Sequence, residues 1–213
     1  MTTRAASKAS YHHGDLARAL IEAGVRAVEE GGAAALQVKK LAEPLGVTHA
    51  AVYRHFRDRA ALQRAIAREG FALLQTKMNR ARDAAPAASR QQLLDVGFAV
   101  IEFALAHPRL SELMFQGHVP TQLSELEGDF AEPEIGFAAL VGLVEQWQRT
   151  GVLRAGEPRE LAMSLWVTTL GLSVLLVSGQ LSLPRKRLRA LVDAVHLRML
   201  DGLAPARGTS KLR

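Results

Sequence analysis

The sequence predicts an all-α protein with about nine helices, in which a small N-terminal domain of three helices precedes a larger helical domain. Apolar residues recur at helical spacing through most of the chain, and no run alternates apolar and polar residues as a half-buried strand would. Glycine and proline fall between these periodic segments, where they begin or end helices. Because 48% of the 213 residues are hydrophobic, the chain has enough apolar side chains for a substantial core.

Local signals at the helix ends set the expected boundaries. Gly31 and Gly32 close the first helix, because glycine readily takes the left-handed conformation. Asp58 caps the fourth helix, since its carboxylate accepts free N–H groups of the first turn. The breaker Asp-Ala-Ala-Pro at residues 83–86 separates this block from the rest. The expected helices are 15–31, 38–45, 48–55, 59–82, 87–106, 108–115, 133–150, 159–178 and 184–203, with a loop at 117–131.

The domain organisation follows from these helices. We expect a flexible basic arm at residues 1–10 and a helix-turn-helix domain at residues 11–70, with its motif at about residues 37–56. A second helical domain is expected at residues 71–203, followed by a flexible tail at residues 204–213.

The composition favours a polyanionic partner and argues against several kinds of chemistry. The formal net charge of +6 and the pI of about 10.2 favour nucleic acid first and an anionic membrane surface second. The absence of cysteine excludes disulfides, thiolate metal ligands and a cysteine nucleophile. No metal site is expected, because His12 and His13 lack a third ligand at a recognisable spacing. No enzyme motif such as a nucleophile elbow, a phosphate-binding loop or a Rossmann fingerprint occurs, so neither an enzyme nor a cofactor is expected.

One uncharged segment, residues 161–184, is long enough for a membrane-spanning helix. Its serine, threonine and glycine residues are also typical of two closely packed helices in a soluble core. Residues 1–10 lack the apolar stretch of a secretory signal. We therefore expect a cytoplasmic protein, with the membrane helix as the alternative.

Residues 38–56 have the pattern of a helix-turn-helix. Gly46 supplies the tight turn, and Thr48 is the N-cap of the second helix. Val52 and Phe56 lie four residues apart, so they are expected to face the core together. The first helix of the pair carries an apolar stripe of Val38, Leu41, Ala42 and Leu45.

The residues between these anchors are expected to face DNA. Ala50 is small enough for the helix backbone to approach base edges, and Arg54 can donate two parallel hydrogen bonds to guanine. Tyr53 and His55 carry polar tips on flat rings, which suits phosphate oxygens. Further backbone contacts are expected from Lys39, Lys40 and Arg59.

Residues 36–62 resemble the signature of the TetR family of transcription regulators. They read LQVKKLAEPLGVTHAAVYRHFRDRAAL, in which Gly-Val and a threonine cap precede Tyr-x-His-Phe. The segment YHHGDL at residues 11–16 is similar to the opening of one large branch of that family. The resemblance implies a sequence-specific DNA-binding regulator, most often a repressor that a small-molecule effector releases from its operator. A charge-driven, nonspecific DNA-binding or membrane-surface protein is the alternative.

The resemblance also assigns roles to single residues. It implies that Tyr53, His55 and Arg59 contact phosphates, and that Thr48 is both cap and phosphate contact. The candidate base-reading residues are His49, Ala50 and Arg54. Two positions depart from the family pattern. Pro44 stands where a helix-forming residue is common, so the first helix is expected to end or bend at Glu43, and Ala60 replaces a frequent acidic residue.

For the second domain, the resemblance implies a homodimer that binds a pseudo-palindromic operator. The helices at 159–178 and 184–203 of two chains would form a four-helix bundle, with one flank of the uncharged segment on its own core and the other on the partner. The family branch often carries Trp-x-x-x-His-Gly on the penultimate helix. Trp166 and Gly171 keep this pattern, but Leu170 replaces the histidine and removes a polar group.

The resemblance also implies that a small-molecule effector binds inside this second domain. No charged cluster looks buried, which favours a hydrophobic or weakly polar effector. The candidate pocket residues are Phe98, Phe103, Phe115, His118, Trp147, Trp166 and Thr169.

Overall fold

The computed structural model describes residues 13–87, 89–116 and 134–203. All regular structure in these ranges is helical, as the sequence predicts. The chain divides between Glu69 and Gly70 into two compact units, here called unit 1 and unit 2. The predicted arm at 1–10, the loop at 117–131 and the tail at 204–213 lie outside the described residues.

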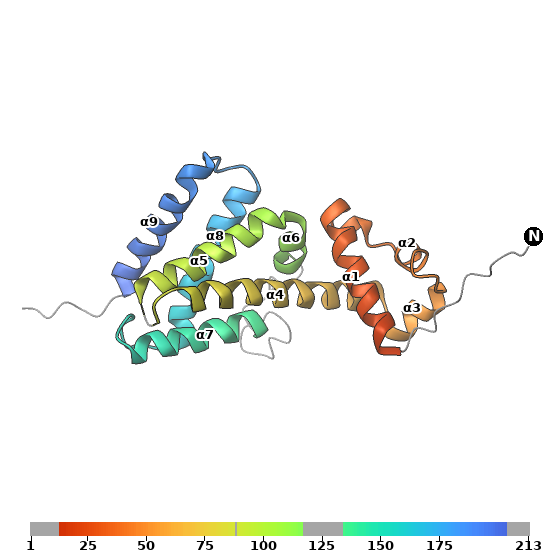
Figure 1. The fold of residues 1–213 in the computed structure, drawn as a ribbon, viewed down its shortest axis with the longest axis horizontal. Helices are drawn as coiled ribbons and strands as arrows, with labels where there is room; N and C mark the ends of the chain where they lie inside the picture. The colour runs from red at the N-terminus through yellow and green to blue at the C-terminus, as the bar shows by residue number, and fades with distance from the viewer. Residues whose placement is uncertain (1–12, 88, 117–133, 204–213) are drawn as a thin grey trace, which may run out of the picture. The chain divides into compact units, whose positions relative to one another are not determined.

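Unit 1 consists of α1 (His13–Gly31), the short 3-10 helix η1 (Ala33–Ala35), α2 (Val38–Ala42), α3 (His49–His55) and the first part of α4 (Arg59–Ala84). Figure 1 shows α1, α2 and α3 grouped around the beginning of α4. Its innermost side chains, each at most 1% exposed, are Leu20, Val28, Leu36, Val52, Leu62 and Ile66. Gly24 of α1 is needed in this core, because a Cβ there would lie 2.3 Å from Cδ1 of Ile66.

The predicted helix ends of unit 1 are confirmed where a local signal sets them. Gly32 has a φ of 68°, so it ends α1 in the left-handed region that favours glycine. The Asp58 carboxylate accepts the N–H of Ala61 at 2.6 Å, and α4 begins at the next residue, Arg59. That hydrogen bond also lowers the pKa of Asp58.

Unit 2 contains the rest of α4 with α5 (Arg90–Ala106), α6 (Pro108–Gln116), α7 (Glu134–Arg149), α8 (Pro158–Val177) and α9 (Arg185–Leu203). Figure 1 shows α5 running through the middle of this unit, where it packs against α6, α8 and α9, while α7 packs against α8. The larger core cluster includes Leu93, Val144, Trp147, Ala162 and Leu165. A smaller cluster joins Ile101, Leu172 and Val192.

Three predicted helix starts among the described residues of unit 2 are wrong by one to three residues. The helix expected from Pro184 begins at Arg185. The helix expected from Ala87 begins at Arg90, because Ser89 caps it by accepting the N–H of Gln92 at 3.1 Å. The helix expected from Arg159 begins at Pro158, whose missing N–H is not needed in a first turn.

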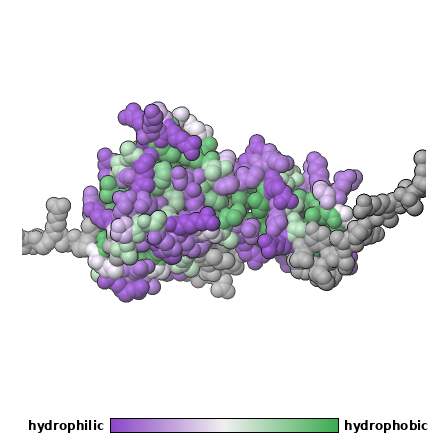
Figure 2. Space-filling view, in the orientation of Figure 1, coloured by the Kyte–Doolittle hydropathy of each residue, from purple (hydrophilic) through white to green (hydrophobic). Residues whose placement is uncertain are grey.

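Helix α8 contains most of the uncharged segment. By length and composition it could cross a membrane, and 39% of its most apolar stretch is buried inside the protein. Its buried face includes Leu161, Leu165 and Leu172, which belong to the two cores of unit 2. Its other face carries exposed apolar side chains, of which Val167 at 59% and Val174 at 53% are the most exposed. Polar side chains cover much of the surface seen in Figure 2, with apolar patches between them.

Gln92 links three helices inside unit 2. Its side chain is 4% exposed, its Oε1 accepts from the indole N–H of Trp147 at 3.1 Å, and its Nε2 donates to the Arg82 carbonyl at 3.0 Å. Both ends of the amide are therefore satisfied within the core. An apolar replacement would leave the buried indole N–H without this acceptor.

We predict that Gln92→Ala lowers the free energy of unfolding by about 1–3 kcal/mol, because a buried donor loses its partner. Urea denaturation measures this loss. The matched control is Gln91→Ala, since the Gln91 side chain is exposed and bonds to Asp95 on the surface of the same helix. Its expected cost is under about 0.5 kcal/mol. Equal losses for the two variants would contradict the role given to Gln92.

Candidate functional site

The turn between α2 and α3 depends on Pro44 and Gly46. Helix α2 ends at Ala42 rather than at the expected Leu45, with Glu43 as its C-cap. Pro44 explains the early end, because it has no N–H to continue the helical hydrogen bonds, while Glu43 itself is still in the helical region with φ −58° and ψ −50°. Gly46 has a φ of 64°, and the N–H of Val47 then donates to the Ala42 carbonyl at 3.2 Å. The expectation that Pro44 ends the helix near Glu43 is confirmed.

Helix α3 begins where the sequence predicts. The Thr48 hydroxyl accepts the N–H of Ala51 at 3.2 Å, so Thr48 is the N-cap. Val52 is 1% exposed and anchors the helix to the core of unit 1. Phe56 does not share a helical face with Val52, because it follows the last helical residue in an extended conformation, with φ −129° and ψ 106°. Its side chain is half-buried.

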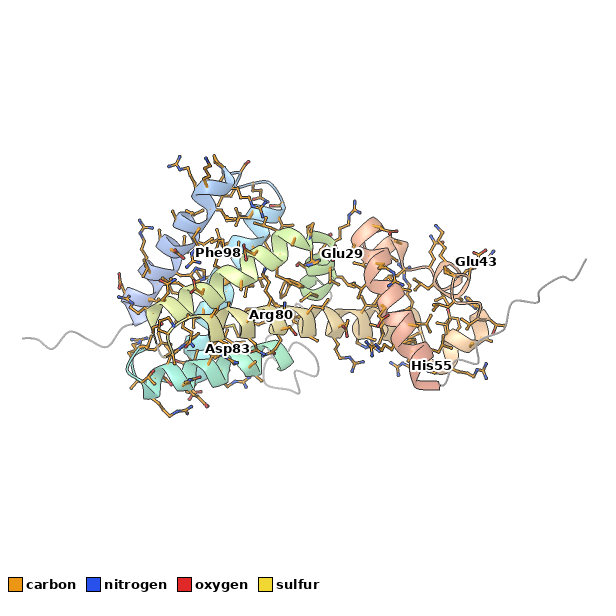
Figure 3. The ribbon with its side chains drawn as sticks, viewed as in Figure 1. Glu29, Glu43, His55, Arg80, Asp83 and Phe98 are labelled. Carbon is orange, nitrogen blue, oxygen red and sulfur yellow. The ribbon has the colours of Figure 1, made fainter. Side chains whose placement is uncertain are left out.

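The predicted DNA-contacting side chains lie at the surface of unit 1. All are exposed except His55, which is half-buried: Lys39, Lys40, Thr48, His49, Ala50, Tyr53, Arg54 and Arg59. The Tyr53 ring is 42% exposed and meets the His49 ring edge-on, with 4.9 Å between their centres. Helices α2 and α3 contain several basic residues and no acidic one, although Glu43 follows α2 directly (Figure 3). This surface is therefore chemically suited to a polyanion.

Arg59 has a contact that the sequence did not suggest. Its guanidinium donates to the Ala33 carbonyl at 2.8 Å and so links the start of α4 to η1. A guanidinium has five N–H donors, so one bond to the backbone leaves others for a phosphate. The predicted phosphate contact of Arg59 stays a prediction.

Unit 2 contains a cavity lined by side chains from α4 to α9. The space between its lining atoms is about 720 Å³, including the open mouth, and its walls are mostly apolar. The aromatic side chains on these walls are Phe71, Phe115, Trp147 and Trp166. The Phe115 ring meets those of Phe71 and Trp166 edge to face, with centre distances of 5.6 and 6.1 Å. A mostly apolar cavity with few polar groups is typical of small-molecule sites.

The structure brings four of the predicted pocket residues together in this cavity: Phe115, Trp147, Trp166 and Thr169. Phe98 and Phe103 do not line it, although both lie on α5. Phe98 lies beside α9 under the Arg189 guanidinium, 4.8 Å from its ring centre (Figure 3), and Phe103 packs against the ring of His107. The face of α5 that meets the cavity carries Val96, Gly97 and Val100 instead. His118 lies outside the described residues.

Sequence reasoning missed His196, which is the buried imidazole of the cavity. It is 1% exposed, and burial lowers its pKa. Its Nδ1 lies 2.8 Å from the Val192 carbonyl oxygen, and its Nε2 lies 2.9 Å from Oγ1 of Thr169. Gly97 makes room for the ring, because a Cβ at this position would lie 2.8 Å from Nε2. The available signal was a histidine one turn beyond Val192, inside the apolar stripe of the last helix.

Comparisons with known families match both units. Residues 20–66 match the bacterial regulatory proteins of the tetR family, and residues 93–199 match the tetracyclin repressor-like C-terminal domain. The chain belongs to the TetR family. The first match contains the helix-turn-helix, and the second contains most of the cavity walls. The resemblance seen in residues 36–62 is thereby confirmed, while these matches do not decide the branch with Trp-x-x-x-His-Gly.

Solved structures share the TetR fold. A protein of unknown function from Rhodococcus sp. RHA1 is 32% identical, with a TM-score of 0.73, and the match covers 92% of this chain and 100% of that one. The fatty acid degradation regulator FadR from Bacillus halodurans is 20% identical over 86% of this chain and 94% of that one, with a TM-score of 0.64. A tetR-family regulatory protein from Rhodococcus RHA1 is 16% identical over 95% of this chain and 100% of that one, with a TM-score of 0.61. None of the curated proteins matches the chain.

Family membership gives the general function. TetR proteins are transcription regulators with a helix-turn-helix DNA-binding domain, not enzymes. DNA binding through α2 and α3 therefore agrees with the exposed basic surface of unit 1. Leu170, which replaces the branch histidine, is one of the residues that line the cavity.

We predict that Gly46→Ala destabilises unit 1 by about 1–2 kcal/mol, the cost of a left-handed conformation for a residue with a Cβ. Nothing lies within 4 Å of a Cβ at this position, so the cost is conformational and not steric. Gly46→Asn is the control, because asparagine tolerates this conformation better. Hydrogen exchange of the α3 amides would reveal the local loss. If alanine and asparagine behave alike, φ at Gly46 does not limit the stability of the turn.

Proposed function

We propose that this TetR protein is a cytoplasmic repressor that leaves its operator when a small, mostly apolar molecule fills the cavity of unit 2. The observation that carries the proposal is the continuity of α4. One end of this helix supplies core side chains of the DNA-binding unit, among them Leu62 and Ile66. Its other end supplies Phe71, Leu74 and Gln75 to the cavity wall. A ligand that shifts the α4 wall would therefore act on a helix that also contributes to the core of the DNA-binding unit.

Within the DNA-binding unit, α3 is the proposed recognition helix. Arg54 reads a guanine, while His49 and Ala50 lie against neighbouring base edges. Tyr53 and His55 contact phosphates and set the register of the helix in the groove. Further phosphate contacts come from Lys39, Lys40, Thr48 and Arg59.

The proposed dimer forms through α8 and α9. An exposed apolar stripe runs along α8 through Met163, Val167 and Val174, and Gly171 lies in the same stretch with open space around it. Soluble proteins rarely leave such a stripe uncovered, and a second copy placed on a two-fold axis would bury it in a four-helix bundle. This arrangement accounts for the uncharged segment without a membrane.

We predict that Arg54→Ala alters the sequence preference, with a loss of about 1–3 kcal/mol confined to one base pair. Tyr53→Ala should instead weaken binding to all sequences similarly, because phosphate contacts carry no base information. The measurement is the affinity of each variant for DNA fragments that the protein selects from its source genome, titrated in the presence of excess random DNA. Arg18→Ala is the control, since Arg18 on α1 is exposed and pairs with Glu22. Binding without any preferred fragment would favour the charge-driven alternative over an operator-specific repressor.

We predict that Val167→Glu converts the dimer into monomers, because it places a charge in the middle of the proposed interface. Light scattering after gel filtration gives the mass of each species. Leu105→Glu on α5 is the control, as Leu105 is an exposed leucine, 39% accessible, on a different helix. A dimer that survives the change at Val167 and dissociates with the control would place the interface elsewhere.

A further inference from the structure

We propose that His196 and Thr169 form the polar subsite of the cavity in unit 2, where they accept a hydrogen bond from the hydroxyl or N–H group of an uncharged, otherwise apolar effector. The inference rests on the proposed function, because it takes this cavity to be the effector site. The two side chains are 1% and 8% exposed, and both line the cavity. They come from different helices, α9 and α8.

The position of the proton on His196 follows from its contacts. Nδ1 lies 2.8 Å from the Val192 carbonyl oxygen, which can only accept a hydrogen bond. Nδ1 therefore carries a proton. Burial lowers the pKa of His196, which favours the neutral ring, so Nε2 has a lone pair and no proton.

The hydroxyl of Thr169 leaves this pair with an acceptor to spare. Its Oγ1 lies 2.9 Å from Nε2 of His196 and 2.9 Å from the Leu165 carbonyl oxygen. The hydroxyl has a single proton, so it can donate to only one of these acceptors. If it donated to Leu165, Oγ1 and Nε2 would face each other with lone pairs only, so the short contact favours donation to Nε2. The hydroxyl oxygen then keeps lone pairs that can accept a ligand O–H or N–H group.

Gly97 fixes the ring in this position. A Cβ at residue 97 would lie 2.8 Å from Nε2 and 3.1 and 3.2 Å from the two adjacent ring carbons. A larger residue at position 97 would therefore require the imidazole to shift. The ring has little freedom to turn Nε2 toward another partner.

The remaining walls determine the charge of the ligand. Among the described lining residues, Gln75 is the one further polar residue besides His196 and Thr169, apart from the two tryptophans. None of these lining residues is a lysine, arginine, aspartate or glutamate. A charged ligand group would have no counterion there and would lose its hydration. A neutral donor matches both the apolar walls and the spare acceptor. Phenols, alcohols and secondary amides have this chemistry.

The test uses the full-length protein and four matched probes: para-pentylphenol, para-pentylanisole, pentylbenzene and para-pentylbenzoate. Both tryptophans of the chain, Trp147 and Trp166, line the cavity, so their fluorescence reports occupancy directly. We expect all three neutral probes to bind, with the phenol about three- to tenfold tighter than the anisole, which cannot donate.

Two variants should change this preference in opposite directions. His196→Leu combined with Thr169→Val removes both acceptors, so the phenol and the anisole should bind this double variant equally. Thr169→Val removes the competing hydroxyl and leaves Nε2 unpaired, so the preference for the phenol should rise. Thr168→Val is the control, because Thr168 also donates to the carbonyl four residues back but does not line the cavity. Binding of pentylbenzene shows in each variant that the cavity is intact.

The pKa of His196, measured by NMR, gives an independent readout. A donor on Nε2 needs the neutral ring, so the phenol should lower this pKa further, whereas an anion would raise it. The titratable group that acts on the ring is Asp193, one turn earlier on α9. The Arg189 guanidinium forms ion pairs with both Asp193 and Asp95 of α5. Thr168→Val should leave the pKa change unaltered.

The outcomes separate the subsite from the proposed function. Neutral probes that bind with no preference for the phenol would overturn the subsite and leave the effector cavity standing. Tightest binding of the benzoate, with a raised pKa of His196, would also overturn it. If no probe changes the tryptophan fluorescence, both the subsite and the effector cavity are wrong.

Discussion

At Gly46 the chain turns back through a left-handed residue, with φ at 64°, and this turn lets α2 and α3 share one core. Pro44 stops α2 just before it, and the Thr48 hydroxyl starts α3 just after it. With both ends fixed, Val52 is directed into the core and Tyr53 and Arg54 into solvent. The DNA-binding surface thus depends on a few backbone angles rather than on many contacts.

Unit 2 combines an apolar chamber with very few polar groups, and those groups are held tightly. Gln92 satisfies the indole of Trp147, while Gly97 leaves space for the ring of His196. In such surroundings one unmatched hydrogen bond has more effect than in water, because no solvent replaces the missing partner. The proposed selection of an effector by a hydrogen bond would need this rigidity, and the buried linkages of α5 would provide it.

Helix α8 has two different apolar faces. The inner face carries Leu165 and Leu172 into the cores of unit 2, and Thr169 into the cavity. The outer face carries Val167 and Val174, which are more than half exposed in the single chain. In the proposed dimer, a helix with this division would serve a core on one side and a partner on the other, which would account for the uncharged residues 161–184 without a lipid bilayer.

The sequence by itself determined the features that depend on neighbouring residues: the helical class, the family signature, the caps at Thr48 and Asp58, and the turn at Gly46. Each of these local signals involves residues only three or four positions apart, so the order of residues along the chain is enough to predict them. The cavity was decided by tertiary structure. Thr169 meets His196 across 27 positions, and Gln92 meets Trp147 across 55. Helical periodicity shows that α5 has an apolar side, but only the packing of its neighbours places Gly97 in the cavity and Phe98 beside α9.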